Sequence, residues 1–141
     1  MKAYAEPGNS QPQDQIELSK QGYFTMLLDE KLRCLESALE DDGFKVVMPP
    51  QGLEDDNLKR KARGWAIVTR NSQNFVEDAV RYDYDVIGIE DIRFIDDKPD
   101  RTNDTVRKIS AAVRRSQVGT RKGNFCLRVR DDGSFHLEQL V

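Results

Sequence analysis

Acidic and amide side chains follow two apolar runs of this chain, at the points where each run ends. Asp29 and Glu30 come directly after the first run, and Asn71 and Asn74 follow the second, residues 65–69. Because ligands bind at the carboxyl ends of strands in open α/β folds, we expect these side chains to share one site. Carboxylate and amide oxygens are ligands for Mg²⁺ or Mn²⁺, and an ion held there could activate water for phosphodiester hydrolysis.

A third source of charge is the Asp55-Asp56 pair, which opens a short helical pattern. Either aspartate could complete the site, whereas the two Asn side chains bring no negative charge to offset the dehydration of a cation. Simpler interpretations exist, because Asp29 and the Asp pair could only cap helices, and Asn71 is a good helix N-cap or turn residue.

A long, mobile loop is expected at residues 90–103, beyond the fourth strand. Glu90, Asp91, Asp96 and Asp97 lie in it and could return negative charge to the site if they face the same cleft.

The periodicity of the apolar residues predicts the elements that position these groups. It indicates strands at 24–28, 44–48, 65–69 and 86–89, helices at 30–42, 54–63, 73–82 and 104–116, and a hairpin from 125–130 and 135–141. Strands that alternate with helices favour an α/β fold with a mostly parallel sheet covered on both faces. Residues 1–22 are polar and lack a period, so we expect a flexible N-terminal extension before one domain at 23–141.

Composition excludes several classes of protein. The chain has 141 residues, enough for one domain, and no apolar run long enough to span a bilayer, so we expect a soluble, cytoplasmic protein with no membrane partner. Cys34 and Cys126 are isolated and suit neither a disulfide framework nor a zinc site. His136 is the sole histidine, which rules out a His-dependent triad within one chain.

Charge is distributed unevenly. Residues 101–130 contain nine Lys and Arg but one acid, Asp104, although the whole chain has a net charge of −3. Such a segment suggests a polyanion or an acidic protein as partner, and an ordinary solvated helix face is the alternative. The candidate nucleic-acid contacts are Lys59, Arg60, Arg70, Arg107, Arg114, Arg115 and Arg121. Trp65 begins an apolar strand, so we interpret it as a core residue, not a base-stacking platform.

Four segments in order carry a resemblance to a family: Leu-Leu-Asp-Glu, Gly-Phe-Lys-Val-Val, Asp-Asn-Leu-Lys-Arg-Lys-Ala and Ala-Ile-Val-Thr-Arg-Asn-Ser-Gln-Asn-Phe. Together they resemble the compact PIN-like proteins found in bacterial toxin-antitoxin neighbourhoods, over about residues 23–141. The resemblance implies a three-layer PIN-like fold with a closing C-terminal β-hairpin. It also implies a Mg²⁺- or Mn²⁺-dependent nuclease centre and, commonly, a homodimer.

Carried over to this sequence, the resemblance assigns Asp29 as the first metal-binding acid and Asp56, or Asp55 instead, as the second. Asn71 and Asn74 occupy the positions of the two later acids, and Glu30 is a further candidate ligand. The amides put metal binding and cleavage in doubt while leaving the fold expectation intact.

Three functions follow as hypotheses. The favoured one is a PIN-like domain that acts on or binds RNA, with a partly degraded Mg²⁺/Mn²⁺ centre and weak or absent nuclease activity. The second is an active metal-dependent ribonuclease toxin. The third is a non-catalytic protein-interaction subunit whose basic C-terminal third docks an acidic partner such as an antitoxin tail.

Overall fold

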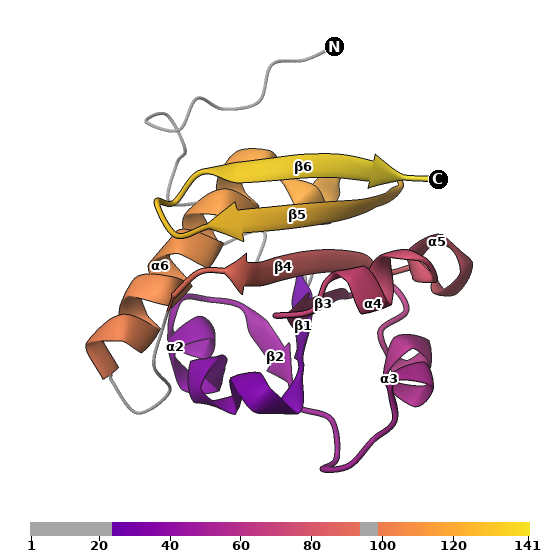
Figure 1. Ribbon diagram of the computed structural model, residues 1–141, viewed down its shortest axis with the longest axis horizontal. Helices are drawn as coiled ribbons and strands as arrows, with labels where there is room; N and C mark the ends of the chain where they lie inside the picture. Colours follow the sequence, from indigo (N-terminus) through magenta and orange to yellow (C-terminus); the bar gives the residue numbers. More distant parts are fainter. Residues whose placement is uncertain (1–23, 94–98) are drawn as a thin grey trace.

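The computed structural model describes residues 24–93 and 99–141, so the extension expected at 1–22 and the acids Asp96 and Asp97 lie outside the described residues. Figure 1 shows six strands and the helices around them. The strands are β1 (Thr25–Leu28), β2 (Lys45–Val47), β3 (Ala66–Thr69), β4 (Asp85–Asp91), β5 (Asn124–Arg130) and β6 (Phe135–Leu140). The helices are η2 (Glu30–Leu35), α2 (Glu36–Asp41), α3 (Asp55–Lys61), α4 (Gln73–Val76), α5 (Ala79–Tyr82), α6 (Pro99–Ser116) and η3 (Val118–Thr120), of which η2 and η3 are 3₁₀ helices.

The strands form one sheet in the order β2-β1-β3-β4-β5-β6. All neighbouring pairs are parallel except β5 and β6, which form the antiparallel hairpin at the C-terminus. The predicted α/β fold with a mostly parallel sheet and a C-terminal hairpin is therefore confirmed.

Two apolar cores cover the two faces of the sheet. One joins alternate residues of the strands to η2, α2 and α6, through side chains such as Leu35, Leu39 and Ile109. The other joins the opposite residues to α3, α4 and α5, through Leu58, Phe75 and Ala79. Trp65, predicted as a core residue, is half-buried and packs against the edge of the second core.

The chain order explains why the two faces are covered by different helices. From β1 the chain crosses one face through η2 and α2 to reach β2, and then crosses the other face through α3 to reach β3 on the far side of β1. Most parallel crossovers are right-handed, so the reversal in the direction of strand addition between β2 and β3 moves α3 to the opposite face. α6 departs from this rule, because it packs on the face of η2 and α2 although β5 is added in the same direction as β4. The reversal makes the carboxyl ends of β1 and β3 a topological switch point, where the connections diverge and a crevice opens.

Two helices predicted as continuous are each divided. The segment expected as a helix at 30–42 begins as the 3₁₀ helix η2, with a kink at Leu32 (φ −104°, ψ 18°), before α2 follows. A 3₁₀ turn aligns residues three apart, and this places Leu32 and Leu35 both in the core. The helix expected at 73–82 breaks near Asp78, whose carboxylate accepts a hydrogen bond from Lys59 Nζ at 2.8 Å.

The predicted long loop at 90–103 is also wrong in part. Glu90 and Asp91 belong to β4, which runs to Asp91, and α6 begins at Pro99 instead of Asp104. Strand pairing with β5 continues to the Asp91–Arg130 pair, and proline is well tolerated in the first turn of a helix.

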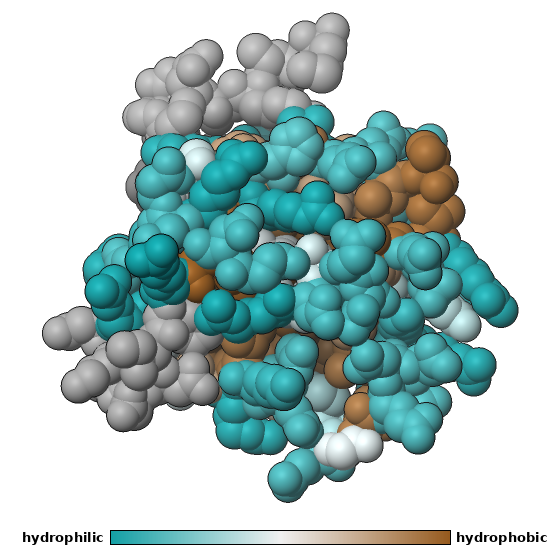
Figure 2. All heavy atoms as spheres, viewed as in Figure 1, coloured by the Kyte–Doolittle hydropathy of each residue, from teal (hydrophilic) through white to brown (hydrophobic). Residues whose placement is uncertain are grey.

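The visible surface in Figure 2 is mostly hydrophilic, apart from an apolar patch near the C-terminus. Among the described residues, the large apolar side chains that are exposed are Val80 and Val141. No helix within 24–93 or 99–141 is long and apolar enough to cross a bilayer.

Arg114 fastens α6 to the end of α2. Its guanidinium donates to the Asp42 carboxylate and to the Asp42 carbonyl, both at 2.9 Å, and lies 5.0 Å from the centre of the Phe44 ring. We expect Arg114→Met to lower the free energy of unfolding by about 1–2 kcal/mol, because the helix-end carbonyl and the carboxylate lose a charged donor. Urea unfolding checks this. The exposed neighbour provides the control, because Arg115→Met should change the free energy of unfolding by less than about 0.5 kcal/mol. Equal losses in the two variants would contradict a stabilising role for the Arg114–Asp42 contact.

Candidate functional site

A cavity of about 510 Å³ lies at the switch point between β1 and β3. Three acids line it: Asp29 and Glu30 after β1, and Asp55 in the first turn of α3. Asn71 and Asn74, after β3, line it as well. The structure therefore brings together the groups that the sequence predicted at the carboxyl edge of the sheet.

Asp56 is the exception among the predicted catalytic residues. It is exposed in the first turn of α3 and does not line the cavity, whereas Asp55 does. Side chains one residue apart on a helix point about 100° apart, so the two adjacent aspartates cannot both face the cavity. Asp55, the alternative left open by the sequence, takes the place assigned to Asp56.

Two cations balance much of the negative charge. Lys31 and Arg70 line the same cavity as the three acids. Lys31 was not predicted as a site residue, and its position directly after Glu30 was the available signal. With two cations against three carboxylates, the cavity has a smaller negative potential than an open acidic centre would have.

Two of the acids already bind backbone N–H groups. Asp29 Oδ1 accepts from the Lys31 amide at 3.3 Å, so Asp29 caps η2 as the simpler interpretation predicted. Glu30 Oε2 accepts from the Gly52 amide at 3.0 Å and fixes the loop before α3. Asn71 does not cap α4, because Ser72 occupies the N-cap position.

A divalent metal ion fits this arrangement poorly. The oxygen donors are of the right type, but in the described part of the chain no three Asp, Glu, His or Cys side chains gather closely enough to hold an ion. Glu30 and Asp29 also share their oxygens with backbone amides.

Ser72 holds the turn that carries the two amides. Its backbone N–H and hydroxyl both donate to Glu90 Oε2, at 3.0 and 2.7 Å, and Arg128 Nε lies 3.4 Å from the hydroxyl. The Ser72 side chain is buried, and its carbonyl accepts from Phe75 in the first turn of α4. Glu90 thus binds the turn from β4 and does not line the cavity, so the possibility that it returns charge to the cleft is not realised.

Gly88 provides the space for this contact. A Cβ on Gly88 would collide with the Glu90 carboxylate and would come within 2.9 Å of Ser72 Cβ. A strand interior normally disfavours glycine, and close approach of another group is the usual reason for finding one there. Gly88 was not among the residues predicted from the sequence, although a lone glycine inside a strand pattern was the available signal.

We expect Gly88→Ala to lower the free energy of unfolding by about 1–3 kcal/mol, because Glu90 and Ser72 must move apart to admit the methyl group. Thermal or urea unfolding would measure the loss, and the side-chain amide signals of Asn71 and Asn74 should shift in NMR spectra. Gly52→Ala is unsuitable as a control because its φ is +79°. Ser134→Ala, on the exposed turn between β5 and β6, is better and should leave those amide signals unchanged.

Three of the seven predicted nucleic-acid contacts are cations that the fold itself uses. Lys59 is buried and forms an ion pair with Asp78 at 2.8 Å, and Arg114 is bound to Asp42. Arg121 Nε donates to the Ser116 carbonyl at 2.6 Å. These three cations act mainly in holding the fold together.

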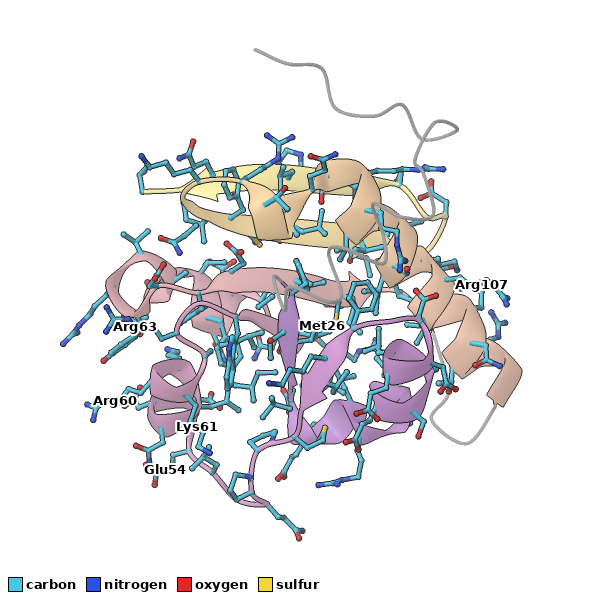
Figure 3. All side chains as sticks on the ribbon, turned by 180° about the vertical axis from the view of Figure 1, so that it is seen from behind. Met26, Glu54, Arg60, Lys61, Arg63 and Arg107 are labelled. Carbon is cyan, nitrogen blue, oxygen red and sulfur yellow. The ribbon has the colours of Figure 1, made fainter. Side chains whose placement is uncertain are left out.

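The remaining predicted cations do not form one surface. Arg60 is exposed on α3 and Arg70 lines the cavity, whereas Arg107 and Arg115 are exposed on α6. Figure 3 shows Arg60, with its neighbours Lys61 and Arg63, on the opposite side of the molecule from Arg107. The structure therefore separates the cations of α3 from those of α6.

Fold and site together define an α/β domain with a mixed polar cavity at its switch point. No family model matches the chain, and neither a curated protein nor a solved structure matches it.

Proposed function

We propose that this chain is a PIN-like domain protein that binds RNA at the carboxyl edge of its sheet and has weak or absent metal-dependent nuclease activity. The observation that carries the proposal is the cavity between β1 and β3, which gathers Asp29, Asp55, Asn71 and Asn74 in the order that the family resemblance implies. Arg70, exposed in the lining, and the exposed cations Arg60 and Lys61 of α3 suit a polyanion.

Reduced cleavage follows from the donors in the cavity. Two amides occupy positions where the resemblance implies acids, and they contribute no charge toward a divalent ion or toward a developing negative charge on water. Lys31 and Arg70 reduce the remaining negative potential further. A homodimer, implied by the family resemblance, and an acidic protein partner, suggested by the basic C-terminal third, stay predictions.

The test measures binding and cleavage of a labelled single-stranded RNA in parallel. We expect binding, followed by fluorescence anisotropy, that weakens steeply with rising salt because phosphate contacts release counterions. We expect little or no cleavage when Mn²⁺ is added. Absence of binding at low salt would overturn the proposal. Mn²⁺-dependent cleavage that disappears in Asp29→Asn, which keeps an acceptor for the Lys31 amide, would establish the active ribonuclease instead.

A matched pair of cation variants locates the RNA. Arg70→Gln, in the lining of the cavity, should weaken binding severalfold and reduce its dependence on salt. Arg115→Gln, on α6, should have a smaller effect. The reverse order of effects would place the RNA on α6 and contradict the proposed surface.

A further inference from the structure

We infer that the cavity between β1 and β3 takes an unpaired RNA base that carries an exocyclic amino group, and that Asn71 and Asn74 hydrogen-bond the edge of that base. The inference rests on the proposed RNA binding and identifies the part of the RNA that enters the cavity.

The size of the cavity and the apolar part of its lining suit a flat ring. Its volume of about 510 Å³ lies within the range of small-molecule sites, about 300–1,000 Å³. Leu53, Leu58, Phe75 and the Pro49-Pro50 pair contribute apolar surface to the lining. An unstacked base gains free energy by covering such surface, whereas a phosphate or a hydrated cation does not.

The two amides are available to a ligand. Asn71 and Asn74 are both exposed, and their side chains make no hydrogen bond with any other described residue. An Asn side chain offers a donor and an acceptor side by side, the pattern that pairs with the adjacent donor and acceptor of adenine. The Glu90–Ser72 contact fixes the backbone of the turn between Asn71 and Asn74, so part of the ordering cost of binding is met before a ligand arrives.

The charged residues that line the cavity favour a neutral base over an anionic phosphate group. Asp29, Glu30 and Asp55 outnumber Lys31 and Arg70, so the cavity repels an anionic phosphate group more than it attracts one. A neutral base is not repelled, and carboxylate oxygens accept hydrogen bonds from its amino group. Uracil lacks such an amino group and presents mainly acceptors, so it should bind less well than adenine, guanine or cytosine.

The first experiment titrates the ¹⁵N-labelled protein with adenosine, uridine and inorganic phosphate. We expect adenosine to shift the side-chain amide signals of Asn71 and Asn74 in a saturable way, uridine to shift them less, and phosphate to leave them in place. Asn57, exposed on α3 and outside the cavity, provides an internal control in every spectrum.

The second experiment measures short oligoadenylate and oligouridylate binding to three variants. Asn71→Ala and Asn74→Ala should each weaken oligoadenylate binding about five- to tenfold, the effect of losing one or two hydrogen bonds. Both variants should therefore show a smaller ratio of oligoadenylate affinity to oligouridylate affinity than the parent chain. Asn57→Ala should leave the affinity for both oligonucleotides unchanged.

The outcomes separate the inference from the function on which it rests. RNA binding that all three variants retain, with no adenosine effect on the cavity amides, would overturn the base site and leave the RNA-binding proposal intact. Failure of both oligonucleotides to bind the parent chain would overturn the RNA-binding proposal. If adenosine then still shifted the amides, the base site would stand, with a free nucleoside as its ligand in place of RNA.

Discussion

Restoring acids at the two amide positions, Asn71→Asp together with Asn74→Asp, is expected to raise the affinity for Mn²⁺ about tenfold or more. Both side chains line the cavity that also contains Asp29 and Asp55. Affinity for a hard cation rises with the number of carboxylates that can reach it, because each one offsets part of the cost of dehydrating the ion. Neither amide has a hydrogen bond to lose within the described residues, so the substitution should leave the fold in place.

Calorimetric titration with Mn²⁺ measures this effect, and Asn57→Asp is the matched control, since it adds one charge on α3 outside the cavity. The same double variant should bind adenosine more weakly, because it replaces the amide donors with acceptors. Equal Mn²⁺ affinity in the parent chain and in the double variant would mean that the cavity is not a degraded metal centre. Gain of RNA cleavage in the double variant would add that only the missing charge prevents the reaction.

Asp85→Asn is expected to increase the free energy of unfolding by about 2–4 kcal/mol at about pH 8 and to have little effect at about pH 3. Asp85 lies at the amino end of β4, where its Oδ1 accepts from the Phe125 amide at 2.8 Å. Burial raises the pKa of Asp85 to about 7 from 3.8, against the lowering effect of the Phe125 hydrogen bond, and Asp83 raises it further.

The direction of the pH dependence follows from proton binding. Between about pH 4 and about pH 7 the folded chain keeps the Asp85 proton while the unfolded chain has lost it, so stability falls as the pH rises through this interval. Above it the whole cost of ionising a buried carboxyl is present. An Asn side chain cannot ionise, yet its carbonyl still accepts from Phe125.

Urea unfolding of both chains at several pH values gives the difference directly, and contributions from other carboxylates cancel in the comparison. Asn57→Ala, at an exposed position of α3, removes no ionisable group and should leave the pH dependence as in the parent chain. If the difference in the free energy of unfolding between Asp85→Asn and the parent chain did not grow with pH, an ionised Asp85 would not be destabilising in the folded chain, contrary to this prediction.

Local patterns predicted the strand positions well. Period and composition located the buried runs at β1, β3 and β4, because the core strands of a parallel sheet must be apolar on both faces. Helix continuity was harder to predict, since the breaks depend on distant partners. The break near Asp78 accompanies its ion pair with Lys59, and nothing in the local sequence of α4 and α5 shows that Lys59 is near.

The sequence by itself determined the order of strands and helices, the polar groups that end β1 and β3, and hence that they share the carboxyl edge of one sheet. These follow from short-range propensity and from the geometry of parallel strands. Only the tertiary structure decided that Asp55 and not Asp56 faces the cavity, that Glu90 binds Ser72 and stays out of it, and that Lys59 and Arg114 hold the fold together. Those outcomes depend on helix rotation and on contacts between residues far apart in the chain, and no local pattern records either.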